Sequence, residues 1–330
     1  MGSKIKQNII AQIYKYCFGI LCLLSFSFPS LILGQQIPLH NQYIYNPLII
    51  NPSFAGVSAI SSVNLTSRSQ WIGFADGINT ISLSGNYALS ETQGVGGTLF
   101  QDNTGAIRIT GLELDYSFKF PLISDYNLSL GLGLVPYQYL YNADLVNHNM
   151  EGNLNSDLQY DPALDNSEKK TNLDANFGLF IYNDFLYAGF SVLNLLQSSP
   201  LSNVGNGPPN QLVRHVYALL GYNYFNTSSK IGLEQTILMR NTSYSGAQFD
   251  FNIKASFNEL FWFSCGYRTN KEVLAGFGVK YGRFGFVYAI DINNGPIGQF
   301  SNSSHEFGLV FYLNNTKFFN WSNDINLQYQ

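Results

Sequence analysis

The chain has 330 residues, of which 15% are aromatic and only 12% are charged, and its formal net charge is −4 at pH 7. The absence of a basic excess excludes nucleic-acid binding through phosphate contacts, and the 45% of apolar residues exclude a disordered chain. What remains is an aromatic-rich, glycine-rich β protein, either globular or embedded in a membrane.

Residues 1–34 are expected to form a cleaved secretory signal peptide. Lys4, Lys6 and Lys15 make a positive start, an apolar run follows over 16–28, and small residues surround Gly34. The apolar run is short for a membrane anchor, which needs about 20 residues. Cleavage would leave Cys265 as the one remaining cysteine, which excludes an internal disulfide and a cysteine-based metal site.

Residues 35–57 are expected to form a periplasmic or plug-like segment. Two Asn-Pro pairs, Asn46-Pro47 and Asn51-Pro52, favour turns or extended backbone and argue against one helix across the whole segment.

Period-two alternation then recurs from Ser58 to about Leu313. The clearest stretch is 247–257, where one face is mostly aromatic or aliphatic, from Phe249 to Phe257, and the other is polar, from Gln248 to Ser256. A strand with two such different faces lies between an apolar and a polar environment.

Fourteen strands are predicted in this way, most of them longer than the five or six residues usual in soluble sheets. Their predicted ranges are 59–70, 78–89, 94–102, 105–120, 125–141, 171–183, 184–192, 211–225, 229–241, 246–257, 259–269, 272–281, 283–291 and 304–313.

The connections between these strands differ in length in a regular way. Those after even-numbered strands are short, whereas several after odd-numbered strands are long and polar, namely 142–170, 193–210 and 292–303. Short turns on one rim and long loops on the other are typical of outer-membrane barrels. A soluble β-sandwich or propeller is disfavoured, because the polar faces carry glycine, asparagine, serine and glutamine more than charge.

The predicted fold is therefore an all-β transmembrane antiparallel barrel over residues 58–313, followed by a C-terminal tail over 314–330. Fourteen strands enclose a lumen wider than side chains from the wall alone can fill. The lumen must be plugged, for which residues 35–57 are the candidate, or it must conduct.

Four short motifs stand at the start of the chain and at strand ends. They are Gln42–Pro47, Asn51–Gly56, Arg68–Phe74 and Ser304–Glu306. In this order and spacing the sequence resembles the PorP/SprF family, outer-membrane proteins of the type IX secretion and gliding-motility apparatus of Bacteroidota.

The resemblance implies a barrel that assists export, or anchors at the cell surface, proteins with a type IX C-terminal domain such as gliding adhesins. The implied partners are this cargo, periplasmic lipoproteins or peptidoglycan-linked components, and the lipid bilayer. Whether the chain is a general secretion component or a paralogue dedicated to one cargo stays open.

The motifs supply the candidate residues for the plug and for partner contacts. Arg68 is expected to pair with a lumen carboxylate or with backbone carbonyls, because an unpaired charge there is costly. Arg68 and Trp71 are expected to help close the lumen or its periplasmic mouth. Arg268 is added from a further short segment, Gly266-Tyr267-Arg268. The full set is Tyr43, Asn46, Pro47, Asn51, Pro52, Phe54, Gly56, Arg68, Trp71, Phe74, Arg268, His305 and Glu306.

Two other functions are weighed against this one. A plugged channel for small or hydrophobic solutes, similar to hydrophobic-compound transporters, is the main alternative. A membrane-embedded enzyme is disfavoured, because no nucleophile and base can be placed together. No catalytic residue, cofactor or metal is predicted, and the acidic 142–170 loop lacks the spacing of an EF-hand calcium loop.

Overall fold

A computed structural model describes residues 41–57, 61–73, 77–122, 125–143, 145, 167–200, 211–243, 245–258, 260–299, 301 and 303–313. All of them belong to one compact unit, residues 34–330. The predicted signal peptide, the predicted tail, Phe74 and the acidic residues predicted as a loop around 150–165 lie outside the described residues.

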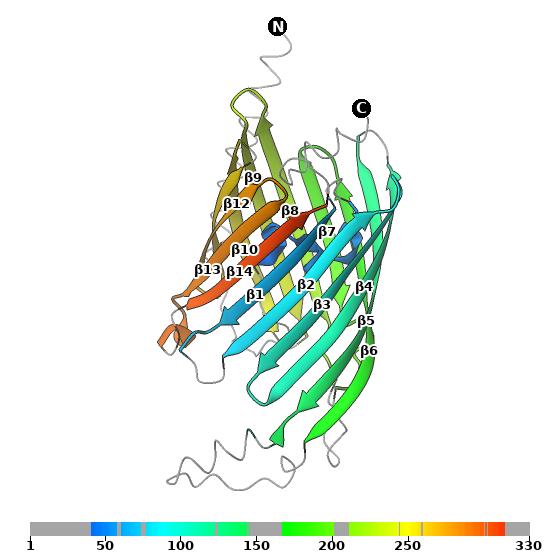
Figure 1. Cartoon of the computed structure of the whole chain (residues 1–330), viewed down its shortest axis with the longest axis vertical. Helices are drawn as coiled ribbons and strands as arrows, with labels where there is room; N and C mark the ends of the chain where they lie inside the picture. The colour runs from blue at the N-terminus through cyan, green and yellow to red at the C-terminus, as the bar shows by residue number, and fades with distance from the viewer. Residues whose placement is uncertain are drawn as a thin grey trace. The chain divides into compact units, whose positions relative to one another are not determined.

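The described residues form fourteen antiparallel strands that close into a barrel (Figure 1). Their bounds are β1 Ser62–Gln70, β2 Ile78–Ala88, β3 Gln93–Thr104, β4 Ile107–Pro121, β5 Asn127–Tyr141, β6 Glu168–Tyr182, β7 Leu186–Leu193, β8 His215–Asn226, β9 Ile231–Thr242, β10 Ser245–Phe257, β11 Phe261–Arg268, β12 Glu272–Tyr281, β13 Phe284–Asn293 and β14 Ser303–Tyr312.

Closure comes from β1, which pairs with β2 on one side and with β14 on the other. Ser62 lies opposite Asn86 in β2 and opposite Tyr312 in β14. Each remaining strand pairs with its neighbours in sequence, so the predicted all-β antiparallel barrel of fourteen strands is confirmed.

The observed strands correspond one to one with the predicted ranges. The strand whose observed start differs most from its predicted start is β8, which begins at His215 and not near residue 211. The cause is local: Leu212 N–H donates to the Ser198 carbonyl at 3.1 Å, so the chain before His215 is bound to a loop and not to a strand.

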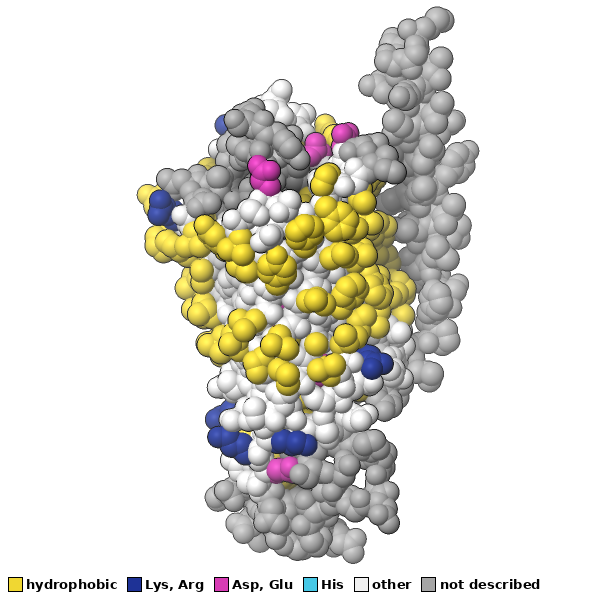
Figure 2. Space-filling model, turned by 90° about the vertical axis from the view of Figure 1, so that its right-hand side faces the viewer, with side chains coloured by type: hydrophobic (Ala, Val, Ile, Leu, Met, Phe, Trp, Pro, Cys, Tyr) yellow, Lys and Arg dark blue, Asp and Glu magenta, His cyan; other side chains and the backbone are white. Residues whose placement is uncertain are grey.

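The wall separates two environments, as the alternation predicts. On β1, Asn64, Thr66 and Arg68 are buried toward the lumen, whereas Leu65 points outward and is 42% exposed. On the face that Figure 2 shows, hydrophobic side chains form a yellow band across the wall. In hydrocarbon such a wall is stable because closure pairs the backbone groups of its strands.

The two rims differ in the length of their connections. One rim, here called the short-turn rim, carries tight turns such as Asn183–Phe185 and Gly282–Arg283. The opposite, long-loop rim carries the connections 142–167, 194–214 and 294–302. The remaining elements in the described ranges are four 3-10 helices: η1 Gln42–Ile44, η2 Pro47–Ile50, η3 Pro52–Phe54 and η5 Pro296–Gln299. In the described part of the chain, no helix is long and apolar enough to span a bilayer.

Candidate functional site: the segment inside the barrel

Residues 41–57, here called the luminal segment, lie inside the barrel (dark blue in Figure 1). Pro47 and Pro52 each occupy the start of a short helix, η2 and η3, where the missing proline N–H leaves no bond unmade. The segment is therefore a chain of single turns, and the prediction that its Asn-Pro pairs prevent one continuous helix is confirmed.

Asn51 fixes the turn between η2 and η3 to the wall. Its Oδ1 accepts hydrogen bonds from Ser53 N at 2.9 Å and Ser53 Oγ at 2.6 Å. Its Nδ2 donates to the carbonyls of Leu179 in β6, at 3.1 Å, and Phe190 in β7, at 3.3 Å. One buried amide thus caps a helix and also holds that helix against two strands.

The wall also satisfies the carbonyls of the luminal segment. These donors are three serines and one lysine on β4, β5 and β7. The bonds are Ser191 Oγ to Ile50 O at 2.5 Å, Ser129 Oγ to Ser53 O at 2.7 Å, Ser117 Oγ to Ala55 O at 2.5 Å and Lys119 Nζ to Gly56 O at 2.7 Å. Irregular backbone at membrane depth is tolerated when protein groups satisfy it in this way.

Glycines in the wall let the luminal segment approach closely. A Cβ atom on Gly131 would lie 2.2 Å from Ser53 N, and one on Gly94 would lie 2.2 Å from the Ala55 carbonyl oxygen. Gly56 faces Gly94 with a positive φ of 59°, a conformation that glycine adopts without strain. Gly94 and Gly131 thus lie where a larger residue would collide with the backbone of the luminal segment.

Apolar side chains complete the packing. Phe54 packs on Phe180 of β6 with ring centroids 4.1 Å apart, and Tyr45 stacks on Trp262 of β11 at 6.3 Å. The buried cluster around Phe54 includes Tyr43, Ile50 and Leu238. Burial of a large apolar side chain contributes about 1.5–3 kcal/mol, so these contacts add to the stabilisation that the hydrogen bonds of the segment provide.

A buried set of charges lies toward the long-loop rim and is here called the arginine network. It consists of Arg68, Arg240 and Arg268 with Asp250, Glu272, Asp291 and Glu306. Arg68 contacts Asp291 at 2.6 Å and Glu306 at 3.2 Å, which confirms the expectation that it meets a lumen carboxylate.

Arg268 joins the two halves of this network. Its guanidinium contacts Asp250 at 2.9 Å, approaches Asp291 at 3.6 Å and pairs with Glu272, and Asp250 pairs in turn with Arg240. Buried charges are stable only when paired and hydrogen-bonded, and here each guanidinium meets at least one carboxylate.

The luminal segment supplies further hydrogen bonds to this network. Asn41 N–H donates to Glu306 at 3.2 Å, and Arg268 Nη2 donates to Asn41 Oδ1 at 3.0 Å. Tyr45 Oη donates to Glu306 at 3.1 Å and Tyr43 Oη to Asp250 at 3.4 Å. Burial, reinforced by these carboxylates, raises the pKa of both phenols well above their usual value of 10, so both stay protonated donors.

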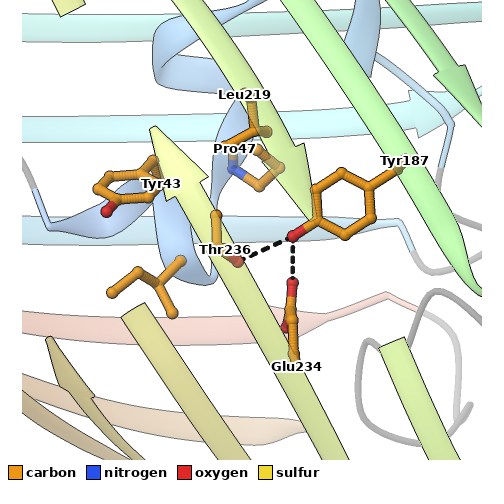
Figure 3. Close-up of a pocket in the computed structure, with 7 residues that line it drawn as sticks. Tyr43, Pro47, Tyr187, Leu219, Glu234 and Thr236 are labelled. Carbon is orange, nitrogen blue, oxygen red and sulfur yellow. Dashed lines mark hydrogen bonds between the residues drawn. The ribbon is translucent and has the colours of Figure 1, made fainter. Parts of the chain in front are cut away.

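A small pocket lies between the luminal segment and the wall (Figure 3). Tyr187 Oη donates to Glu234 at 2.7 Å and lies 2.9 Å from Thr236 Oγ1. Glu234 also pairs with Lys254, whose Nζ donates to the Ile44 carbonyl at 3.2 Å. Of the polar groups that line the pocket, those of Tyr187, Glu234 and Thr236 are thus bonded to one another, and the Tyr43 hydroxyl is bonded to Asp250. Its lining residues are Tyr43, Ile44, Pro47, Tyr187, Leu219, Glu234 and Thr236.

Most of the candidate residues from the sequence meet in the lumen. Asn46 donates to Ser84 Oγ at 2.7 Å, Gly56 lies against Gly94, and Arg68 and Glu306 contact each other across β1 and β14. The candidates gathered there are Tyr43, Asn46, Pro47, Asn51, Pro52, Phe54, Gly56, Arg68, Arg268 and Glu306.

Two candidates lie elsewhere. His305 is on the outward face of β14, one residue from Glu306, and its Nδ1 lies 2.6 Å from Tyr288 Oη. Trp71 follows the end of β1 at the long-loop rim, with a φ of 59°, and its N–H donates to Ser304 Oγ at 3.1 Å. Neither contacts the luminal segment through a described hydrogen bond.

Of the four carboxylates in the arginine network, Glu306 was among the candidates from the sequence and the other three were not. These three, Asp250, Glu272 and Asp291, each stand on the polar face of an alternating strand, and the two candidate arginines, Arg68 and Arg268, require partners. That signal could have marked them, but the pairing needs the strand register, which the sequence alone does not supply.

A closed barrel with an apolar outside, a polar inside and a lumen occupied by its own N-terminal segment is an outer-membrane barrel. The chain belongs to the PorP/SprF family, because the family model described as "Type IX secretion system membrane protein PorP/SprF" matches residues 32–311. Membership makes the protein a membrane component of a secretion machinery. No curated protein matches the sequence.

Among solved structures, the chain is similar to three outer-membrane proteins at low identity. The Pseudomonas putida toluene transporter TodX shares 12% identity at a TM-score of 0.42, over 87% of this chain and 96% of that one. The Ralstonia pickettii toluene transporter TbuX shares 10% at a TM-score of 0.44, over 80% and 92%. A Pseudomonas aeruginosa FadL homologue shares 11% at a TM-score of 0.39, over 77% and 88%.

Proposed function

We propose that this barrel assists the export or the cell-surface anchoring of a secreted protein, such as an adhesin with a type IX C-terminal domain. The observation that carries the proposal is the combination of family membership with an occupied lumen. A secreted domain has no free path through a lumen that residues 41–57 cross, which favours a receptor or anchor over a conduit.

In this proposal the parts of the chain have separate roles. Residues 1–34 direct export and are removed, residues 35–57 plug the barrel, and the barrel over 58–313 carries the partner surface. The motif residues inside the lumen hold the plug. Trp71 and His305, which lie away from it, are left as candidates for contact with cargo, while the tail over 314–330 and the short-turn rim face periplasmic lipoproteins or peptidoglycan-linked components.

The test is the surface proteome of a deletion strain. We expect one or a few proteins with a type IX C-terminal domain to disappear from the surface and to accumulate in the periplasm or the medium. Surface biotinylation with mass spectrometry measures this, with the wild-type gene restored as the control. Unchanged surface display would contradict the proposal, and loss of uptake of a hydrophobic solute with normal display would favour the channel.

A further inference from the structure

Strand β6 is paired along its full length on one side only. On the β5 side the register runs without a break from Asn127 opposite Tyr182 to Tyr141 opposite Glu168. On the β7 side it covers only Phe177 to Tyr182. Among the described residues, the half of β6 nearest the long-loop rim therefore has no neighbouring strand on that side.

The chain after β7 is drawn away from β6 by buried polar groups. Asp174 accepts hydrogen bonds from Leu196 N at 2.9 Å and Ser198 N at 3.2 Å, and Asn194 N donates to Asn176 Oδ1 at 3.1 Å. Both acceptors are buried on the lumen side of β6. Residues 194–198 thus turn inward over the lumen and do not continue along the strand edge.

The last backbone bond on that edge is from Leu195 N to Ala175 O, at 2.8 Å. In an antiparallel strand, alternate residues direct both their N–H and their C=O to the same side. Leu173, Thr171 and Lys169 therefore point their backbone groups the same way as Ala175, and no described backbone group bonds to them there. These three residues present a short open edge.

This edge lies at and beyond the end of the hydrophobic band. Leu173 is 49% exposed and is the last apolar outward side chain of β6, next to Pro136 in β5. Thr171 and Lys169 are exposed beyond it, opposite Gln138 and Leu140. Unpaired backbone groups are tolerated there because water can hydrogen-bond to them, whereas in hydrocarbon each unpaired N–H or C=O group would cost several kcal/mol.

Basic side chains surround the open edge. Lys169 is on the edge itself. Leu140 of β5 lies between Lys169 and the exposed Arg108 of β4, and all three are on the outer face. The exposed Arg214 donates a hydrogen bond to the Leu195 carbonyl at 2.9 Å. Figure 2 shows lysine and arginine side chains below the lower end of the hydrophobic band. Lysine on an edge discourages indiscriminate pairing, and a strand with acidic side chains would meet complementary charge.

We infer that the open edge of β6, Lys169 to Leu173, docks an acidic, extended segment of a protein partner, which adds to the barrel wall as a strand. Main-chain hydrogen bonds to Lys169, Thr171 and Leu173 supply affinity, and Lys169, Arg108 and Arg214 select the charge. This inference rests on the proposed function, since the cargo or a companion of it is the partner at this rim.

The first experiment measures peptide binding to the full chain in detergent. The probe is a fluorescent synthetic peptide in which glutamate alternates with valine and threonine, compared with one in which lysine replaces glutamate. Thr171→Pro removes an edge N–H that β5 does not use, and Thr171→Ala is the matched control. We expect the acidic peptide to bind, Thr171→Pro to weaken it about tenfold or more, and Thr171→Ala to leave it unchanged.

A second variant distinguishes a loss of peptide binding from a folding defect. Lys169→Glu keeps the backbone edge and should weaken the acidic peptide while strengthening the lysine peptide. Equal binding by wild type and Thr171→Pro, no binding of the acidic peptide, or no charge preference would overturn the inference. Binding that appears only after residues 146–164 are deleted would assign the edge to the chain's own loop and would also overturn it.

In cells, the role of the open edge and the proposed function can be tested separately. Loss of surface cargo in both the deletion strain and the Thr171→Pro strain, at normal barrel level, supports both. Loss in the deletion strain alone would overturn the role of the edge and leave the proposed function standing.

Discussion

Arg68 joins the wall to the luminal segment through shared carboxylates. Its side chain is 1% exposed, and its partners Asp291 and Glu306 are equally enclosed. Glu306 also accepts from Asn41 and Tyr45, so one carboxylate links β1, β14 and the luminal segment. A buried ion pair adds little net stability, but removal of one partner leaves the remaining charges buried without compensation.

Arg68→Ala is therefore expected to destabilise the barrel by about 3–5 kcal/mol. The measurement is the midpoint of thermal unfolding in detergent, followed by the mobility shift between folded and unfolded barrel on gels. Arg108→Ala, at an exposed position, is the control and should change stability by no more than about 0.5 kcal/mol. Equal midpoints for the two variants would show that the arginine network is not a structural unit.

At the scale of elements, glycine and serine in the strands are matched to the turns of the luminal segment. A Cβ on Gly131 would meet Ser53 N at 2.2 Å and Pro52 C at 2.4 Å, both backbone atoms that cannot turn aside. Gly131→Ala should thus displace η3 from the wall, at a cost of about 1–3 kcal/mol for overpacking.

The displacement can be read from one engineered cysteine. With Cys265→Ser removing the exposed native thiol, Ser53→Cys places a thiol at a position that is fully buried. Maleimide labelling should be slow in that background and faster with Gly131→Ala. Gly246→Ala is the control, because a Cβ there meets nothing within 4 Å. Equal protection in both variants would mean that the segment does not depend on the glycine.

The strands could be predicted from the sequence, and the contacts between them could not. Alternation is a local property, so the fourteen ranges and the inward position of Arg68 follow from neighbouring residues. The pairing of Arg68 with Asp291 depends on the register of β1, β13 and β14, which no local pattern encodes. For the same reason His305 and Glu306, adjacent in one motif, were grouped together although they face opposite sides of the wall.

For the whole molecule, the luminal segment makes the difference between a blocked lumen and an open one. It contacts strands around the barrel, from Ser84 on β2 to Glu306 on β14. Its removal would leave the arginine network, with four carboxylates and three guanidinium groups, facing water in the lumen. Charge at a constriction sets the preference of a pore for one sign of ion, and here the excess is one negative charge.

Deletion of residues 41–54 is therefore expected to turn a silent barrel into a weakly cation-preferring pore. Single-channel recording in planar bilayers measures this, with Gly246→Ala as a control that should stay as silent as the wild type. A gel mobility shift establishes first that the deleted chain still forms a barrel, since it loses the packing of Phe54 on Phe180. Equal conductance with and without the segment would mean that residues 41–57 do not close the lumen, and steady conductance by the intact chain would favour the solute channel.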